Sequence, residues 1–307
     1  MSDRPNVLLI GNGLNRAFDG VSWDKLLENI KCRDDIDVAS LHSPEPLRAI
    51  IVTNDQVDAA MKDNKSKMLG EIKTDEQLQV LRTITDMGFD HILTTNYGYE
   101  IEAAVCGKST FSEKDAKAFM RHTDEVKRAE QTLLLHTYEE VKGRKIWHIH
   151  GEARKPDSMI LGHYYYGNLL FKMKEYLKKK NDSFKKAQSE GKAVEIKSWV
   201  DAFILGDVYI LGFGFGLSEF DLWWLLNRRK REKADIGGIY LYEAKPDGYN
   251  ERLDLLKLLG VEIIDCGFEK KKNSDGKEEL CGSYKDFYYA AISDIREKLQ
   301  EAQHEQK

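Results

Sequence analysis

The chain has 307 residues, of which 41% are hydrophobic and 32% are charged, and it can bury one large core or two modest ones. Its net charge of −5 and its pI near 6.0 argue against a general nucleic-acid-binding role, which needs a basic surface to displace counterions from phosphates. The sequence contains no apolar run of the length of a signal peptide or a membrane span, so we expect a cytoplasmic protein without a membrane partner.

The cysteines are widely separated and include no Cys-x-x-Cys pair: Cys32, Cys106, Cys266 and Cys281. A zinc ribbon needs closely paired cysteines, so the spacing excludes one. We expect structural thiols in a reducing compartment, with disulfides as the less favoured alternative.

The first predicted strand covers residues 6–10 and runs directly into the turn Gly11-Asn12-Gly13. Its four consecutive apolar residues are typical of a parallel strand that is buried on both faces. Glycine permits positive φ, and its amide can approach a phosphate closely at the start of a helix. Plain strand-to-helix chain reversal would explain the same pattern, and a full dinucleotide fingerprint would need a third glycine where Arg16 stands.

Mostly helical sequence follows the first turn. Ser22 is a plausible N-cap for a short helix, and the apolar spacing from Glu76 to Met87 indicates an amphipathic helix. Residues 31–88 therefore form a first helical insertion, in which we recognise no chemistry.

The second predicted strand, within residues 89–97, ends in Thr94-Thr95-Asn96. Ligands of open α/β sheets bind outside the carboxyl ends of the strands, so these polar residues are candidates to face one. The alternative is that they only end the strand and cap a helix that begins near Tyr99. Helices are predicted again over 107–143.

The third predicted strand ends in His148-Ile149-His150-Gly151, and strand alternation puts the two histidines on one face. Two histidines could ligate a metal, but the spacing indicates no third ligand, so we predict no metal. One histidine is expected to be a hydrogen-bonded interior residue. His150, next to the glycine, is better placed for acid–base chemistry near neutral pH.

A third helical insertion is predicted over 164–200, and a fourth strand over 208–211 is followed by three alternating glycines, Gly212, Gly214 and Gly216. These glycines permit close approach of the backbone to a ligand, and Ser218 resembles an N-cap. Strands are predicted over 239–243 and 261–265, then a polar loop over 269–280 and a closing helix from Tyr284.

Four strand-and-turn blocks occur in the same order as the signatures of the sirtuin family: Gly-Asn-Gly-Leu-Asn, Thr-Thr-Asn-Tyr, His-Gly and the glycine-rich turn. The chain is also similar to the sirtuin-like NAD-cleaving domains of prokaryotic anti-phage defence, such as the Thoeris effector, in a Trp-x-x-Leu-Leu segment that begins at Trp23. The resemblance implies an α/β fold with a Rossmann-like parallel sheet of about six strands in a single domain.

The resemblance also implies site residues. Asn96 and His150 match the catalytic positions, and NAD contacts are implied for Gly11, Asn12, Gly13, Asn15, Thr95, Gly212, Gly214, Ser218 and Glu243. The family usually has an aspartate against the nicotinamide amide two places after the asparagine. This chain has Gly98 there, for which Glu100 or Glu102 could substitute.

The implied function is an NAD glycohydrolase, an NAD⁺ hydrolase that releases nicotinamide and ADP-ribose as an anti-phage, abortive-infection effector. Asn96 would hold the ribose hydroxyls and the attacking water, and His150 would accept a proton from either of them. Deacylation is less favoured, because the zinc ribbon that frames the peptide cleft of deacylases is missing. The alternatives are an NAD-dependent deacylase or ADP-ribosyltransferase, and a silent NAD-binding module, which Gly98 favours.

Regulation is expected to come from outside the domain. The sequence after the sixth strand has room for one loop and one helix, so we expect no fused sensor domain. We expect a homo-oligomer, with a separate sensor or partner protein as a further possibility.

Overall fold

A computed structural model of the chain describes residues 4–123, 134–189, 194–232, 236–244, 250–267, 269–272 and 278–305. Its main sheet contains β1 (Asn6–Ile10), β2 (His91–Thr94), β3 (Met120–Thr123), β4 (Thr137–Val141), β5 (Arg144–His148), β6 (Asp207–Leu211), β7 (Ile239–Glu243) and β8 (Glu262–Asp265). The strand order is β3-β4-β5-β2-β1-β6-β7-β8. The six strands from β5 to β8 are parallel, as predicted, and β4 and β3 extend the β5 edge in antiparallel pairing. The protein therefore has the expected α/β, Rossmann-like fold.

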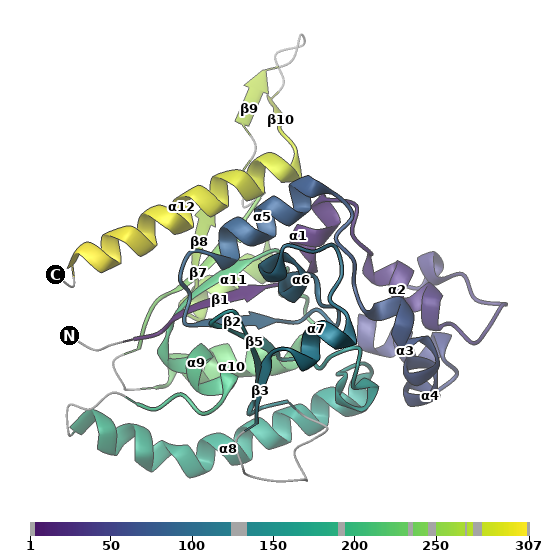
Figure 1. Cartoon of the computed structure of the whole chain (residues 1–307), viewed down its shortest axis with the longest axis horizontal. Coiled ribbons are helices and arrows are strands. Elements are labelled where there is room, and N and C mark those ends of the chain that lie inside the picture. The colour runs from purple at the N-terminus through teal and green to yellow at the C-terminus, as the bar shows by residue number, and fades with distance from the viewer. Residues whose placement is uncertain are drawn as a thin grey trace.

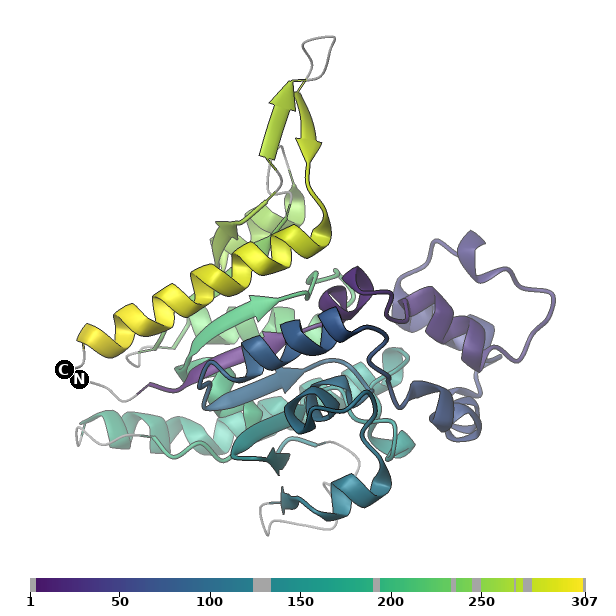
Figure 2. The same ribbon diagram turned by 45° about the horizontal axis from the view of Figure 1, so that its top comes forward.

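Helices cover both faces of this sheet (Figures 1 and 2). They are α1 (Asn12–Ala17), α2 (Trp23–Ile30), α3 (Glu45–Val52), α4 (Val57–Asn64), α5 (Asp75–Thr85), α6 (Glu100–Cys106), α7 (Glu113–Lys117), α8 (His163–Ser189), α9 (Trp199–Leu205), α10 (Phe220–Lys230), α11 (Glu251–Leu258) and α12 (Tyr284–Glu305). Ser22 caps α2 as predicted, because its hydroxyl accepts a hydrogen bond from the amide of Lys25 at 3.2 Å. Among the described residues, none of the helices is both long and apolar enough to span a membrane.

Strand β1 shows why the sheet is buried on both faces. Leu8 and Ile10 belong to a core that also contains side chains of α1, α5, α6 and α12, whereas Val7 and Leu9 belong to a second core with α8 to α11. All four side chains are at most 1% exposed. Alternate residues of a strand point to opposite faces, so a strand between two helical layers must be apolar at every position. The apolar run in the sequence thus follows from a three-layer fold.

The direction of the chain reverses between β1 and β6. The chain passes from β1 to β2 and β5 on one side, and later from β6 to β7 and β8 on the other. The turns that follow β1 and β6 are in direct contact, because the Gly11 amide donates to the Leu211 carbonyl at 3.0 Å and the Gly13 amide donates to the Gly212 carbonyl at 2.7 Å. Such a reversal is the usual ligand position of an open α/β sheet.

Two predicted elements differ in the structure. The prediction of helices throughout 107–143 is wrong, because the described part contains β3 and β4 beside α7. Strand β4 joins β5 through the two-residue turn Lys142-Gly143, and both turn residues have positive φ, as hairpin turns with the twist of the strands require. The predicted polar loop over 269–280 includes the strands β9 (Glu269–Lys272) and β10 (Glu278–Cys281), which form a hairpin that projects from the body of the molecule (Figure 2).

The contact between the two glycine turns gives a stability prediction. A Cβ atom at residue 11 would lie 2.5 Å from the Gly212 carbonyl oxygen, whereas a Cβ at residue 214 would meet nothing within 4 Å. We therefore expect Gly11→Ala to lower the free energy of unfolding by about 1–3 kcal/mol and Gly214→Ala to change it by less than about 0.5 kcal/mol. Urea unfolding of both variants checks this, and equal stabilities would contradict the packing described here.

Candidate active site

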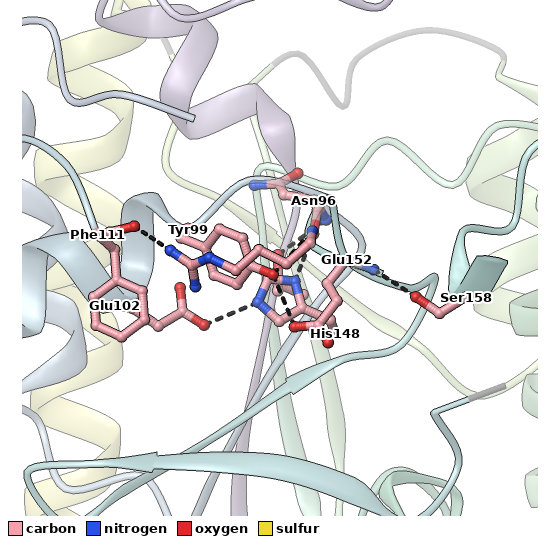
Figure 3. Close-up of polar contacts among 9 residues, drawn as sticks. Asn96, Tyr99, Glu102, Phe111, His148, Glu152 and Ser158 are labelled. Carbon is pink, nitrogen blue, oxygen red and sulfur yellow. Dashed lines mark hydrogen bonds and ion pairs between the residues drawn. The ribbon is translucent and has the colours of Figure 1, made fainter. Parts of the chain in front are cut away.

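The loop after β2 is fixed to β5 through His148. His148 pairs with Thr94 in the register of the two strands, and its Nδ1–H donates to the backbone carbonyl of Asn96 at 2.8 Å. Its Nε2–H donates to the Glu102 carboxylate at 2.9 Å (Figure 3). The backbone N–H of Asn96 donates to the Thr94 hydroxyl at 3.1 Å. Both ring nitrogens of His148 face acceptors, so these two hydrogen bonds require the protonated ring.

The charge of His148 is stabilised by its surroundings. Burial by itself lowers the pKa of His148, but the charges of Glu102 and Glu152 and the hydrogen bonds to Glu102 and Asn96 outweigh it and raise the pKa to about 9. Glu102 is fully buried. A buried carboxylate with a buried imidazolium is a strongly coupled pair, in which removal of one partner leaves an uncompensated charge. His148 is thus an interior, hydrogen-bonded histidine, and its role is to hold the backbone of Asn96.

Aromatic and charged side chains pack against the His148–Glu102 pair. The Tyr99 hydroxyl donates to Glu152 at 2.9 Å, and the guanidinium of Arg154 lies 3.8 Å from the centre of the Tyr99 ring. Arg154 also donates to the Phe111 carbonyl. In the part of the chain that the structure describes, the Asn96 carboxamide makes no hydrogen bond. The network therefore fixes the Asn96 backbone and leaves its side chain available.

His150 follows β5 and belongs to a second buried cluster. Its Nε2–H donates to Asp221 at 2.8 Å, and its Nδ1 lies 3.8 Å from a carboxylate oxygen of Glu219. The Tyr166 hydroxyl donates to the same Glu219 oxygen at 3.0 Å. His150 is 3% exposed, so it is as buried as His148.

The two carboxylates control the protonation of His150. Burial lowers the pKa of His150, but the charges of Asp221 and Glu219 and the hydrogen bond to Asp221 overcome this effect and raise it above 6.5. Burial raises the pKa of Glu219 to about 7, although the charge of His150 acts in the opposite direction. His150 must lose a proton that the cluster favours before it can act as a base.

The three residues of this second cluster also lie close enough together to share a metal ion. His150, Glu219 and Asp221 each offer one ligand atom, and these atoms lie within 4.8 Å of one another. Three protein ligands are the usual number in a catalytic metal centre. The same residues also hold His150 as an imidazolium, because Asp221 accepts from Nε2–H and Glu219 lies near Nδ1. The geometry therefore fits both a clamped imidazolium and a three-ligand metal centre.

Several predicted NAD contacts have protein partners in this structure. Asn12 donates to the Val21 carbonyl at 2.6 Å, and the Asn15 carboxamide, which is 3% exposed, accepts from Gln77 at 3.1 Å. Glu243 pairs with Arg252 at 2.5 Å, and Arg252 also donates to the Gly214 carbonyl at 2.7 Å. The amides of Gly11 and Gly13 donate across the turns, so a phosphate would have to be bound by other groups at this junction.

The remaining predicted residues lie beside the two clusters. Thr95 is half-buried in the loop after β2. Ser218 is not an N-cap, because α10 begins at Phe220 after Glu219, and the Ser218 hydroxyl instead donates to Glu45 of α3 at 2.8 Å. This bond connects the first helical insertion to the glycine-rich turn after β6.

The structure distinguishes the two glutamates proposed to replace the missing aspartate. Glu102 is bound to His148. A carboxylate oxygen of Glu100 lies 2.6 Å from where a Cβ at residue 98 would stand. That oxygen is buried and has no hydrogen-bond partner among the residues that the structure describes. Burial raises the pKa of Glu100 to about 7. Glu100 therefore occupies the space that a side chain at position 98 would take.

A family model described as the SIR2-like domain matches residues 90–264, from the start of β2 into β8. The chain belongs to the SIR2-like domain family. Because SIR2-like domains use NAD, the chain belongs to a family of NAD-using proteins. No curated protein is similar enough in sequence to be matched to it. β1, the Gly11–Gly13 turn and α12 lie outside the matched segment.

Sequence reasoning missed the partners of the two histidines in this SIR2-like domain. Glu102 is 46 residues before His148, and Asp221 is 71 residues after His150. The only sequence signal was the position of Glu219 and Asp221 directly after a glycine-rich turn at a strand end, where a ligand site was already expected.

The raised pKa of His148 predicts how stability depends on pH. A group whose pKa is higher in the folded state stabilises the fold below its unfolded pKa and loses that effect as the pH rises through the folded value. For His148 the window is about pH 6.5 to 9, and the loss is about 3 kcal/mol. Urea unfolding at pH 6.5 and 9.5 should show this loss in the wild type and a flatter dependence in His148→Gln. Parallel curves for the two proteins would exclude His148 as the cause.

Proposed function

We propose that the protein is an NAD glycohydrolase. Water would replace nicotinamide at C1′ of the adjoining ribose, so that the C1′–N bond breaks, a C1′–O bond forms, and nicotinamide and ADP-ribose leave. The proposal is supported mainly by the position of four turns, which contain Gly11, Asn96, His150 and Gly212. Each turn follows a parallel strand, so all four lie at the same edge of one sheet. The chain reversal between β1 and β6 lies at this edge as well. A dinucleotide along this edge would reach both the glycine turns and the asparagine.

The chemistry proposed here needs orientation and charge stabilisation. Nicotinamide leaves as a neutral molecule from a cationic ring, so its departure needs little acid catalysis, while positive charge develops on the ribose. The Asn96 carboxamide would hold the ribose hydroxyls and the water. His150 would accept the proton through Nδ1, since Nε2 faces Asp221, and the carboxylates of Glu219 and Glu100 would favour a cationic sugar.

Two other functions compete with hydrolysis. An NAD-dependent deacylase or ADP-ribosyltransferase would use the same residues but pass ADP-ribose to an acyl-lysine or another acceptor. A silent NAD-binding module would bind without turnover, and Gly98 favoured that alternative in the sequence. Glu100 beside Gly98 weakens this objection, because it offers a carboxyl group near the missing aspartate.

Proton NMR of NAD incubated with the purified protein tests the proposal. We expect nicotinamide and ADP-ribose from the wild type, and a loss of rate of at least about 100-fold in Asn96→Ala and His150→Ala, because each removes a group acting on the reacting atoms. The exposed His42 gives the matched control His42→Ala, which should keep the full rate. Wild-type turnover in either site variant, with circular dichroism showing a fold, would remove that residue's role.

The same assay separates the alternatives. Release of nicotinamide only when an acyl-lysine peptide is added would favour deacylation, and a mass increase of an acceptor protein would favour transfer. Tight NAD binding without product would favour the silent module.

The clamped His150 predicts the pH dependence of cleavage. The proposed base is the neutral form of His150, and the pKa of His150 is raised above 6.5. We therefore expect kcat/KM to increase with pH above pH 6.5, as His150 loses its proton. Asp221→Asn removes the charge that favours the proton and should move this increase down by about one pH unit or more. Asp254→Asn, at an exposed position of α11, is the matched control. An increase at the wild-type pH in Asp221→Asn would show that another group controls the rate.

We also propose that the enzyme is an anti-phage effector of the Thoeris-effector type, which depletes NAD in the infected cell. Its proposed partners are further copies of itself and a separate sensor. The NMR assay over a series of protein concentrations tests whether activity depends on self-assembly. A specific rate that rises with protein concentration supports assembly-dependent activity, and a constant specific rate argues against it.

A further inference from the structure

The C-terminal helix α12 contributes a side chain to the junction of the two glycine turns. Helix α12 packs beside α5 and α1 (Figures 1 and 2), and the family match ends before it. The hydroxyl oxygen of Tyr288 lies 2.8 Å from where a Cβ at residue 13 would stand and 3.3 Å from the corresponding point at residue 212. The absence of both Cβ atoms makes room for this hydroxyl group.

The Tyr288 hydroxyl has no hydrogen bond within the described residues, like that of Tyr209 and unlike those of four other buried tyrosines, although Tyr288 is only 4% exposed. Tyr97, Tyr99, Tyr166 and Tyr242 each donate to a carbonyl or a carboxylate. The hydroxyl oxygen of Tyr288 is not fully enclosed by the protein, so it is accessible from outside. A hydroxyl that is accessible at the chain reversal can donate a hydrogen bond to a bound ligand.

The charges near Tyr288 indicate what kind of acceptor fits. Burial raises the pKa of Tyr288, as do Tyr284 and the carboxylate of Glu243, whereas Arg16 acts in the opposite direction, so the hydroxyl keeps its proton and can donate at neutral pH. Arg16 is an exposed cation of α1 and has no carboxylate within salt-bridge distance among the described residues. A hydroxyl donor at the junction of the turns and a guanidinium on the helix that follows the first turn suit phosphate oxygens.

We propose that Tyr288 donates a hydrogen bond to a diphosphate oxygen of bound NAD at the junction of the turns after β1 and β6. The proposal rests on the proposed function and deepens it, because it extends the dinucleotide site to a helix outside the matched segment. The contact is remote from C1′, so it acts on binding: Tyr288→Phe should raise KM and leave kcat unchanged.

Calorimetry with ADP-ribose, a product that cannot be cleaved at the same bond, gives a readout independent of turnover. We expect Tyr288→Phe to bind ADP-ribose about tenfold more weakly than the wild type, as for one lost hydrogen bond to a charged group. The matched control is Tyr289→Phe, on the next residue of α12, whose hydroxyl donates to Glu76 at 2.8 Å. It should bind like the wild type.

The outcomes separate this inference from the proposed function. Because the Tyr288 hydroxyl has no hydrogen-bond partner among the described residues, Tyr288→Phe should unfold at the wild-type urea midpoint, and a weaker affinity then reports the ligand contact. Inorganic pyrophosphate should displace ADP-ribose from the wild type and do so about tenfold less well from Tyr288→Phe, which a contact to a ribose hydroxyl would not produce. Equal ADP-ribose affinities for the two proteins overturn the role of Tyr288 alone. A wild type that does not bind ADP-ribose overturns the proposed function as well.

Discussion

The hydrogen bond from the Gly13 amide to the Gly212 carbonyl, at 2.7 Å, marks the contact on which the arrangement of this molecule depends. It joins the two turns between which the chain reverses its direction through the sheet. A contact this close is possible only because residues 11, 13 and 212 have no side chains. The sequence predicts that these glycines approach a phosphate. In the structure they also have a packing role, because they allow the ends of β1 and β6 to lie side by side.

Two buried histidines organise the strands on one side of this reversal, and they do so differently. His148 is held between Glu102 and the Asn96 carbonyl, which fixes a backbone position. His150 is held between Asp221 and Glu219, which fixes a ring and its proton. His148 is the last residue of β5 and His150 follows the strand, so the two histidines belong to two different clusters. The excess of carboxylates around them favours positive charge at this edge of the sheet.

Much of the fold could be predicted from the sequence because it follows from local patterns. The six parallel strands appear as short apolar runs. The central strands β1, β2 and β6 are followed by glycine or threonine, and their burial between two helical layers requires the apolar pattern. The antiparallel strands β3 and β4 were missed because their evidence is one turn, Lys142-Gly143, in which a lysine adopts positive φ. Lysine is an unusual residue at such a position, so the hairpin has no clear signature in the sequence.

The candidate site was predictable only in part, for the same physical reason. Strand ends can be located one at a time, but the partners of His148 and His150 come from helices far along the chain, and Tyr288 comes from the last helix. Hydrogen-bond partners at such separations leave no periodicity in the sequence. The two glutamates after Gly98 give a second example. Glu102 pairs with His148, and Glu100 lies against Gly98, but nothing in the local sequence indicates which glutamate takes which position.

The central claim is that one dinucleotide site extends from the glycine turns to Asn96 and His150, and a crystal structure of the complex with ADP-ribose tests it most directly. The account predicts a diphosphate at the junction of the turns after β1 and β6, with the free ribose directed toward the Asn96 carboxamide and His150. Density for the ligand elsewhere, with the carboxamide and the imidazole out of contact with its sugar, would contradict the account.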